Sequence, residues 1–237
     1  MRIALMVIRL IFWVPYLFGG ICWHGVRKDY NFEEAYKHIQ LVARKACKAG
    51  RVTLEADGME NLPKENGFIF FPNHQGLFDV LVFLATCDKP FTVVIKKEAS
   101  NIILLKQVIR ALRAHVIDRE DIRQSMQVIK AMVEDVKEKK NVLIFAEGTR
   151  SKQGNTVGTF KGGSFKSATM SKCPIVPCAL VDSFKPFDEN SIKPVTVKLR
   201  YLTPIYYEEY KDMKASEIAA EVQSRIQNAI NEMVGEV

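Results

Sequence analysis

Short runs rich in β-branched and aromatic residues alternate with helical patterns from residue 51 onward, and this alternation constrains the fold more than any other feature. Strands are predicted at residues 52–56, 67–71, 91–95, 114–117, 141–145, 175–181 and 195–201. Helices are predicted at residues 78–85, 101–112, 121–139, 163–170 and 215–234. Such alternation is typical of an α/β domain with a mixed sheet covered by helices. No internal repeat or low-complexity linker divides it, so we predict one domain over residues 51–237.

The segment ahead of this domain is apolar from residue 3 to residue 23, except for Arg9. As one continuous helix it would measure roughly 32 Å at about 1.5 Å per residue, which just spans a hydrocarbon core of about 30 Å. Pro15 and the Gly19–Gly20 pair interrupt the run, and its aromatic residues are of the kind that lie at lipid headgroups. We expect membrane attachment, with a half-inserted, monotopic arrangement favoured over a transmembrane helix.

A signal peptide or a buried core helix fits this segment less well. A signal peptide also has a basic residue ahead of an apolar stretch, but no A-x-A-like cleavage site follows here. A buried core helix of this length ordinarily carries a polar face. Membrane attachment is therefore the better prediction, with the interface marked by Trp13, Trp23, Arg2, Arg27 and Lys28.

A second helix is predicted at residues 32–49, with apolar residues at helical spacing and basic residues among the other positions. It ends at Gly50. An amphipathic, basic helix of this kind either lies on an anionic membrane surface or packs against the main domain. We group residues 1–50 as an N-terminal, membrane-binding appendage of two helices.

The overall charge favours an anionic partner. The chain has 34 Lys and Arg against 27 Asp and Glu, a formal net charge of +7. This balance suits a phosphorylated metabolite, an anionic lipid surface or nucleic acid. No nucleic-acid-binding module and no interleaving of basic and aromatic residues is recognisable, so nucleic acid is not an expected partner.

The cysteines and histidines do not suggest a metal site. The five cysteines are scattered without a C-x-x-C pair, which argues against a disulfide framework and favours a reducing, cytosol-facing compartment. Cys173 and Cys178 are best explained as buried residues. His24, His38 and His115 fall in different predicted elements and lack metal-ligand spacing. We predict no metal and no bound cofactor.

A histidine and an aspartate follow the strand predicted at residues 67–71, in the sequence NHQGLFD, as His74 and Asp79. If this loop turns back on itself, Asp79 can accept a hydrogen bond from one imidazole nitrogen and leave the other as a base. Taken alone, the pair is better explained by a solvated loop histidine near a surface aspartate.

Three more predicted strand ends carry basic residues. They are residues 96–98 (KKE), 118–119 (DR) and 146–151 (AEGTRS), and Arg150 of the last offers a guanidinium suited to phosphate. Ligands of α/β sheets bind where strands end and helices begin, so we expect these loops to meet His74 at one edge of the sheet. The combination indicates a base that faces an anionic, phosphorylated substrate.

Two motifs, H-x-x-x-x-D at His74 and Asp79 and E-G-T-R at residues 147–150, resemble those of the glycerolipid acyltransferase family, most nearly its lysophosphatidic acid acyltransferase branch. The resemblance extends over residues 52–181 and includes GMENLP at 58–63, KKE at 96–98, VIDR at 116–119, FKGGSFK at 160–166 and PIVPCAL at 174–180. Ala146 departs from the family pattern, in which a proline usually precedes E-G-T-R. By this resemblance, residues 51–237 are an acyltransferase domain.

The resemblance implies transfer of a fatty acyl group from acyl-CoA or acyl carrier protein to the free hydroxyl of lysophosphatidic acid, which yields phosphatidic acid for phospholipid synthesis. His74 would take the hydroxyl proton, and Asp79 would hold the imidazole tautomer and stabilise its charged form. The substrate hydroxyl replaces the serine of a triad, so no acyl-enzyme is needed. Arg150 is expected to bind the acceptor phosphate, with Lys97 and Arg119 as supporting cations.

The remaining residues of the E-G-T-R motif, Glu147, Gly148 and Thr149, are expected to complete the substrate-binding site. Glu147 would orient the cationic groups, and backbone amides near Gly148 or Gly76 are candidates to bind the oxyanion. The appendage would hold the active site at the cytoplasmic face of a membrane.

Two alternatives stay open on the sequence alone. One is the same chemistry on another lysophospholipid acceptor. The other is a non-catalytic membrane protein that keeps the fold and only binds phospholipid or an acyl carrier. The intact His74 and Asp79 favour the enzyme.

Overall fold

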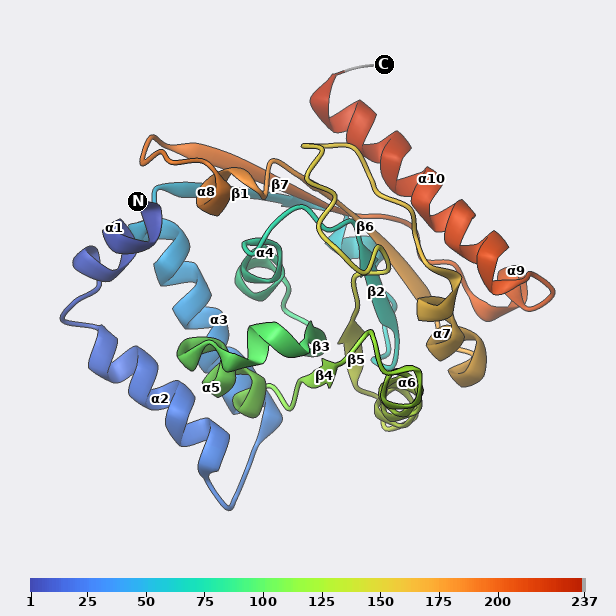
Figure 1. Cartoon of the computed structure of the whole chain (residues 1–237), viewed down its shortest axis with the longest axis horizontal. Coiled ribbons are helices and arrows are strands. Elements are labelled where there is room, and N and C mark those ends of the chain that lie inside the picture. Colours follow the sequence, from blue (N-terminus) through green and yellow to red (C-terminus); the bar gives the residue numbers. More distant parts are fainter. Residues whose placement is uncertain (236–237) are drawn as a thin grey trace.

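A seven-stranded mixed sheet forms the centre of the computed structural model, which describes residues 1–235 (Figure 1). The strands are β1 (Val52–Asp57), β2 (Ile69–Pro72), β3 (Phe91–Lys96), β4 (His115–Ile117), β5 (Asn141–Leu143), β6 (Ile175–Val181) and β7 (Val195–Tyr201). Their order across the sheet is β1-β7-β6-β2-β5-β3-β4. The five strands from β6 to β4 run parallel, whereas β7 and β1 run the opposite way. The predicted α/β fold class with a mixed sheet is confirmed.

The helices also follow the predicted pattern, with ends shifted by a few residues. They are α1 (Arg2–Arg9), α2 (Val14–Val26), α3 (Phe32–Ala49), α4 (Asp79–Thr86), α5 (Ile103–Ala111), α6 (Ile122–Lys137), α7 (Lys166–Ser171), α8 (Lys185–Asp188), α9 (Tyr207–Tyr210) and α10 (Ala215–Val234). Three 3₁₀ turns add η1 (Met59–Asn61), η2 (Lys97–Asn101) and η3 (Gly162–Phe165). The short helices α8 and α9 were not predicted, because four residues carry too little periodic signal.

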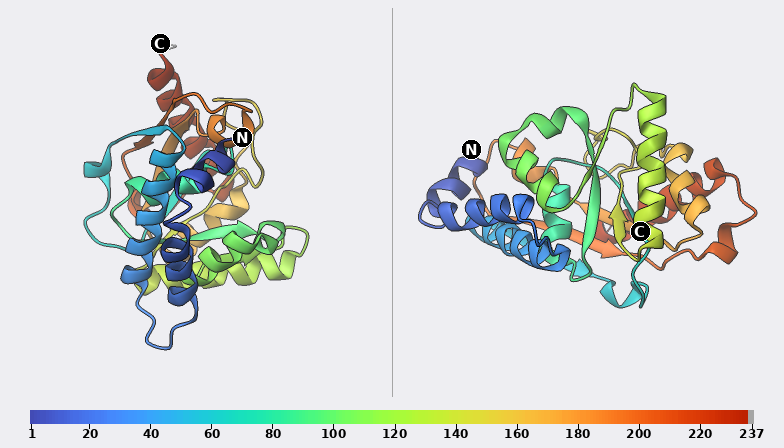
Figure 2. Two further views of the ribbon diagram at one scale, coloured as in Figure 1. Left: turned by 90° about the vertical axis from the view of Figure 1, so that its left-hand side faces the viewer. Right: turned by 90° about the horizontal axis from the view of Figure 1, so that it is seen from below.

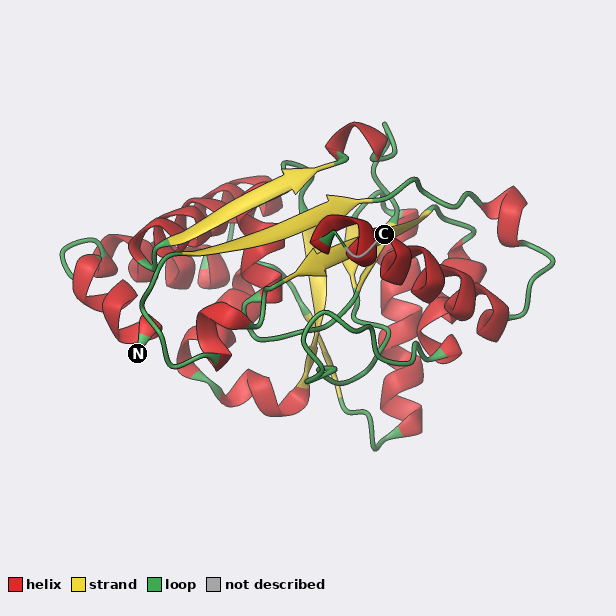
Figure 3. Ribbon diagram, turned by 90° about the horizontal axis from the view of Figure 1, so that it is seen from above, coloured by secondary structure: helices red, strands yellow, loops and turns green. Residues whose placement is uncertain are grey.

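Helices cover both faces of the sheet, and each face has its own hydrophobic core (Figures 1 and 3). One core joins α3 and α4 to the sheet, and the other joins α6, α7 and α10 to it. Successive residues of a strand point to opposite faces, so the fully buried Phe70 and Phe71 of β2 belong to different cores. The central strand β2 is therefore held on both sides immediately before His74.

The apolar N-terminal segment is not one continuous helix. It divides into α1 and α2, which are bent by 98° relative to each other. Pro15 accounts for the break, because proline is tolerated in the first turn of a new helix but not in the interior of a continuing one. Within residues 1–235, no single helix is long and apolar enough to span a membrane, although α1 and α2 together meet that length and composition. Figure 2 shows these helices grouped with α3 at one end of the molecule.

Two arginines join α1 to the rest of the chain. The buried guanidinium of Arg2 donates to the carbonyl oxygens of Gly50 (2.5 Å), Lys193 (2.8 Å) and Pro186 (3.1 Å). Arg9 donates to the carbonyl of the last residue of α3 at 3.2 Å. The expectation that Arg2 marks a membrane interface is therefore wrong, since its side chain is buried where α1 meets the end of α3 and the segment before β7.

The amphipathic helix α3 packs against the sheet domain, which was one of the two uses considered for it. Tyr36 is buried and its hydroxyl donates to the carbonyl of Cys87 at the end of α4 (3.0 Å). Met6 of α1 and Ile21 of α2 belong to the same hydrophobic core as Tyr36. Residues 1–50 thus share a core with the sheet domain.

The loops that follow the parallel strands meet at one edge of the sheet. His74 follows β2, Lys97 follows β3, Arg119 follows β4, and residues 147–150 follow β5. The strand β6, which pairs with β2, also ends there and is followed by residues 182–183. Because neighbouring parallel strands end on the same side, the loops predicted to form the site are brought to a common edge.

Candidate active site

The strand β2 is extended towards the site by the side chain of Asn73. Its amide group donates to the carbonyl of Leu180 at 3.0 Å, and its oxygen accepts from the N–H of Leu180 at 2.7 Å. Asn73 is buried, so this pair continues the bonding between β2 and β6 by one more position. The chain then turns through residues 74–78 into α4, which begins at Asp79.

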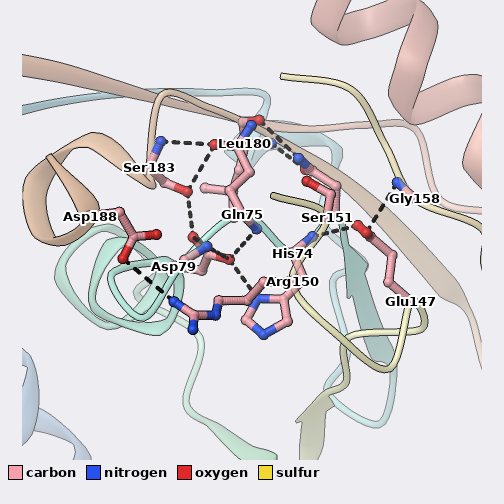
Figure 4. A network of polar contacts seen from close by, with 12 residues as sticks. His74, Gln75, Asp79, Glu147, Arg150, Ser151, Gly158, Leu180, Ser183 and Asp188 are labelled. Carbon is pink, nitrogen blue, oxygen red and sulfur yellow. Dashed lines mark hydrogen bonds and ion pairs between the residues drawn. The ribbon is translucent and has the colours of Figure 1, made fainter. Parts of the chain in front are cut away.

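The imidazole of His74 is held by the carboxylate of Asp79 (Figure 4). The distance from His74 Nδ1 to Asp79 Oδ2 is 2.7 Å, and Asp79 is fully buried. Because a carboxylate faces Nδ1, that nitrogen carries the proton and Nε2 is the basic one. Within residues 1–235, His74 Nε2 has no hydrogen-bond partner, and the side chain keeps 17% of its surface exposed.

Three further donors fix the Asp79 carboxylate. The N–H of Gln75 donates to Oδ2 at 2.7 Å, and the N–H of Gly76 lies 3.0 Å from both oxygens. The hydroxyl of Ser183 donates to Oδ1. With His74, these groups occupy both carboxylate oxygens, so the orientation of Asp79 is set by its surroundings.

Ser183 and the side chain of Gln75 were not predicted to take part in the site. The N–H of Ser183 donates to Gln75 Oε1 at 2.8 Å, and Gln75 Nε2 donates to Asn155 Oδ1 at 2.9 Å. Asn155 is in turn bonded to Asp182 through its own amide group. One signal for Ser183 was available, because it lies two residues after the C-terminal end of the strand predicted at residues 175–181.

Glu147 binds the backbone of the loop that carries His74. Its Oε1 accepts from the N–H of His74 at 2.7 Å, and its Oε2 accepts from the N–H of Gly158 at 3.1 Å. Burial raises the pKa of the Glu147 carboxyl above its ordinary value. The predicted orienting role therefore has a geometric basis, but the groups that Glu147 bonds are backbone amides and not the cations.

The loop after β5 bonds both backbone groups of His74. Glu147 accepts from its N–H, and the N–H of Ser151 donates to its carbonyl at 2.9 Å. The aromatic ring of Phe145 stacks on the imidazole, with ring centroids 4.1 Å apart. Residues 145–151 therefore place Arg150 beside His74 (Figure 4).

The three basic residues predicted to bind the substrate phosphate have different surroundings in the structure. Arg150 forms an ion pair with Asp188 at 3.4 Å next to the site. Arg119 donates to the carbonyl of Gly148, which joins the loops after β4 and β5. Lys97 is exposed and paired with Asp118 at 2.9 Å, and this hydrogen bond raises the pKa of Lys97.

The remaining motif residues differ in what they contribute. Gly148 has a φ of +72°, and Lys161 lies so close that a β-carbon there would come to 3.0 Å from Nζ. Thr149 is exposed and makes no side-chain hydrogen bond within the described residues. The amides of Gly148 and Gly76 already donate to the carbonyl of Phe145 and to Asp79. These two candidates for binding an oxyanion are therefore engaged in the structure.

A cavity of about 290 Å³ lies next to the His74–Asp79 pair. Phe145, which stacks on His74, forms part of its wall. Further apolar side chains line it, namely Val94, Ile117, Ile122, Met126, Ile129 and Ile144. Three basic side chains line it as well, namely Arg119, Lys161 and Lys166. A cavity with both apolar and basic lining suits a chain that carries a phosphorylated end.

Side chains of the metal-ligating types do not gather into a site in the described part of the chain. Within residues 1–235, His, Cys, Asp and Glu form no group of three or more able to hold a metal ion. The cysteines at 47, 87, 173 and 178 are buried. Burial raises the pKa of the Cys173 thiol to about 11, so it is not an activated nucleophile. The expectation of no bound cofactor stays a prediction.

The sequence profile of the acyltransferase family matches residues 53–181. This match covers more than half of the chain, so the chain belongs to the acyltransferase family. The His74–Asp79 pair and residues 147–150 both lie inside the matched segment.

Relatives of known name carry one activity in common. The chain is 30% identical to the 1-acyl-sn-glycerol-3-phosphate acyltransferase of Borreliella burgdorferi, over 57% of this chain and 54% of that protein. It is 29% identical to the protein of the same name from Cocos nucifera, over 62% of this chain and 48% of that protein. The chain thus matches about half the length of these relatives.

The fold is shared with a solved structure across nearly the whole chain. The 1-acyl-sn-glycerophosphate (LPA) acyltransferase PlsC from Thermotoga maritima superposes with a TM-score of 0.78, covering 98% of both chains at 21% identity. At that identity the likeness shows a common fold, including the N-terminal helices.

Ser183 provides a test of the geometry around Asp79. We expect Ser183→Ala to lower kcat for acyl transfer about tenfold, because Asp79 loses a buried donor and orients His74 less well. The KM values should change little, since Ser183 does not face the cavity. Steady-state kinetics measure this. Ser167→Ala, which removes another buried hydroxyl hydrogen bond, is the matched control, and an equal loss in both variants contradicts the assignment.

Proposed function

We propose that this protein transfers a fatty acyl group from a thioester to the free hydroxyl of lysophosphatidic acid and forms phosphatidic acid. The observation that carries the proposal is the His74–Asp79 pair, in which a buried carboxylate holds Nδ1 and leaves Nε2 without a hydrogen-bond partner among residues 1–235. Membership of the acyltransferase family and the names of the relatives support the choice of reaction.

In this proposal His74 is the general base. Nε2 accepts the proton of the acceptor hydroxyl as its oxygen attacks the thioester carbonyl carbon. Asp79 stabilises the imidazolium that forms. The carbon–sulfur bond then breaks, and the thiol leaves with the proton that His74 returns. The acceptor hydroxyl takes the place of the serine in a serine–histidine–aspartate triad, so no residue of the chain is acylated.

Arg150 is proposed to bind the phosphate of the acceptor. Its guanidinium is half-buried beside His74, and its ion pair with Asp188 has a separation of 3.4 Å. At this separation a phosphate competes well with Asp188 for the N–H donors of the guanidinium. Lys97 and Arg119 add positive charge from the loops after β3 and β4. Glu147, Gly148 and Thr149 shape the loop that presents Arg150.

The cavity beside Phe145 supports the choice of acyl donor. Its aliphatic lining suits the alkyl part of a thioester, and Lys161 and Lys166 offer positive charge at its edge. Acyl-CoA and acyl carrier protein share a phosphorylated pantetheine arm, so both donors satisfy this chemistry.

Residues 1–50 are proposed to hold the active site at the cytoplasmic face of a membrane in a monotopic arrangement. The exposed side of α1, α2 and the turn between them carries large apolar side chains, among which Phe12 of the turn is 95% exposed. Lys45 lies 3.8 Å from the ring centroid of Trp13, and Arg27 lies 4.3 Å from that of Trp23. Aromatic rings paired with cations suit the headgroup region of an anionic membrane.

The reaction is tested by thiol release from a long-chain acyl thioester in the presence of lysophosphatidic acid. His74→Ala is expected to reduce the rate about 10² to 10⁴-fold, because general-base assistance is lost. His115→Ala is the matched control, since His115 also bonds an aspartate (Asp135, 2.6 Å) but lies at the other end of its strand. Comparable turnover by His74→Ala contradicts the mechanism, and binding of lysophosphatidic acid without turnover by the unaltered protein favours the non-catalytic alternative.

Arg150→Ala tests the choice of acceptor. We expect it to raise KM for lysophosphatidic acid about 10- to 100-fold, from the loss of charged hydrogen bonds, while KM for the acyl thioester changes little. Lys130→Ala on the exposed side of α6 is the control for overall charge. An acceptor without a phosphate monoester, such as lysophosphatidylcholine, should be insensitive to Arg150. Equal effects on donor and acceptor would argue against phosphate binding by this residue.

Membrane attachment is tested with single variants on the exposed surface of α1, α2 and the turn between them, because deletion of these helices would also open the core that holds Met6 and Ile21. Ile8→Ser and Phe12→Ser are each expected to weaken sedimentation with mixed phosphatidylcholine and phosphatidylglycerol vesicles about tenfold. Met170→Ser, on α7, removes an apolar side chain that is 46% exposed elsewhere on the molecule. If it weakens binding as much as Phe12→Ser, the proposed attachment is wrong.

A further inference from the structure

Exposed apolar side chains outside the N-terminal helices gather in the segments that follow β2, β3 and β4. We define the apolar rim as Leu77, Ile102, Ile103, Leu104 and Ile122, of which Ile103 is 75% and Ile122 is 83% exposed. Each member follows the C-terminal end of β2, β3 or β4. The other large apolar side chains that are exposed within residues 27–235 stand in four separate places, namely Met170, Ile192, Tyr206 and Val234. Exposed apolar surface is therefore concentrated at the edge of the sheet that carries His74.

Local structure does not require these residue types. Ile102 is the N-cap of α5 and Ile103 its first residue, positions at which polar residues ordinarily satisfy the free backbone N–H groups. Ile102, Ile103 and Leu104 are consecutive and all exposed. The helix α6 has an ordinary polar N-cap, Asp121. Its first residue, Ile122, is nevertheless an exposed isoleucine like Ile103 of α5. Single exposed apolar residues are common, but a consecutive set beside a site marks a contact surface.

Two members of the rim, Leu77 and Ile122, lie beside the site. Leu77 stands in the loop between His74 and Asp79. Ile122 lines the cavity together with Phe145, which stacks on the His74 ring. Ile102 directly follows η2, whose first residue, Lys97, is joined to the loop of Arg119 through Asp118. A surface that covers Leu77 and Ile122 therefore lies against the loop of His74 and the cavity that Phe145 lines.

We propose that the apolar rim inserts into the lipid bilayer as a second membrane contact of the protein, separate from α1 and α2. The proposal rests on the proposed function, because the acceptor is then a lipid that enters from the bilayer. With the rim in the bilayer, a lysolipid passes from the membrane to His74 without crossing water. The exposed aliphatic residues replace water as the surroundings of its chain at the entrance.

Charge and continuity favour a bilayer as the occupant. The segment that bears most of the rim, residues 96–123, contains seven Lys and Arg against four Asp and Glu, which suits anionic lipid. The helix α2 packs along α5, and a β-carbon at Gly25 of α2 would come to 3.1 Å from Arg110 Cβ of α5. The part of the rim on α5, Ile103 and Leu104, thus belongs to a helix that packs against α2.

The test compares Ile103 and Leu104 with matched positions in the full-length chain. Ile103→Ser and Leu104→Ser, made together, are expected to lower sedimentation with mixed phosphatidylcholine and phosphatidylglycerol vesicles about tenfold. The loss should persist at high salt, because it removes apolar and not charged contacts. Ile103→Phe keeps an apolar side chain and should bind as the unaltered protein does. Met170→Ser is the control for exposure elsewhere.

Vesicle binding is measured in the His74→Ala background, so it needs no turnover. If the proposed reaction is wrong, the result on vesicle binding is unaffected. If the rim does not contact the membrane, the result on thiol release is unaffected. In the active protein, the double variant should lose about tenfold in rate on long-chain lysophosphatidic acid in vesicles and keep its rate on a short-chain, water-soluble acceptor. Unchanged vesicle binding by the double variant overturns the proposal. A dimer in solution that the double variant dissociates also overturns it, because the rim then contacts a second copy of the chain.

Discussion

The carboxylate of Asp79 is wholly buried, and a charge in that position is tolerated only when hydrogen bonds replace its lost water. Two of its donors, the amides of Gln75 and Gly76, come from its own loop. The hydroxyl of Ser183 comes from the loop after β6. These loops meet only because β2 and β6 are parallel neighbours that end on the same side. The sheet order, the bend before α4 and the orientation of His74 are thus parts of one arrangement around a single buried charge.

The sequence predicted those features whose signals are local. Each strand shows as a short apolar run, and the pairing of His74 with Asp79 needs only a loop of four residues between them. Contacts between distant segments have no such signal. Ser183 lies 104 residues from Asp79, and Arg119 reaches the carbonyl of Gly148 only because β4 and β5 flank β3. The amides of Gly76 and Gly148 were predicted as candidates to bind an oxyanion, but both form hydrogen bonds within their own turns. Those bonds depend on the backbone conformation of the turns, which the sequence does not reveal.

The N-terminal segment shows a different limit. Apolar composition alone does not distinguish a helix that faces lipid from one that faces a core. The structure divides the segment at residues 10–13, where Phe12 is exposed, whereas Ile21 of α2 is buried in the core. Arg2, which composition places beside the membrane, is bonded to three carbonyls of the folded chain. Residues 1–50 therefore pack one side against the sheet domain and leave apolar side chains exposed on another side.

Both backbone groups of His74 are bonded to the segment that carries Arg150, through Glu147 on the N–H and Ser151 on the carbonyl. The backbone segments that carry the imidazole and the guanidinium are consequently joined by hydrogen bonds. If Arg150 binds the phosphate as proposed, the distance between the two side chains limits how far along the glycerol backbone the attacking oxygen can lie. Regiochemistry, meaning which of two hydroxyls on the same lipid is acylated, then depends on the distance between these two groups.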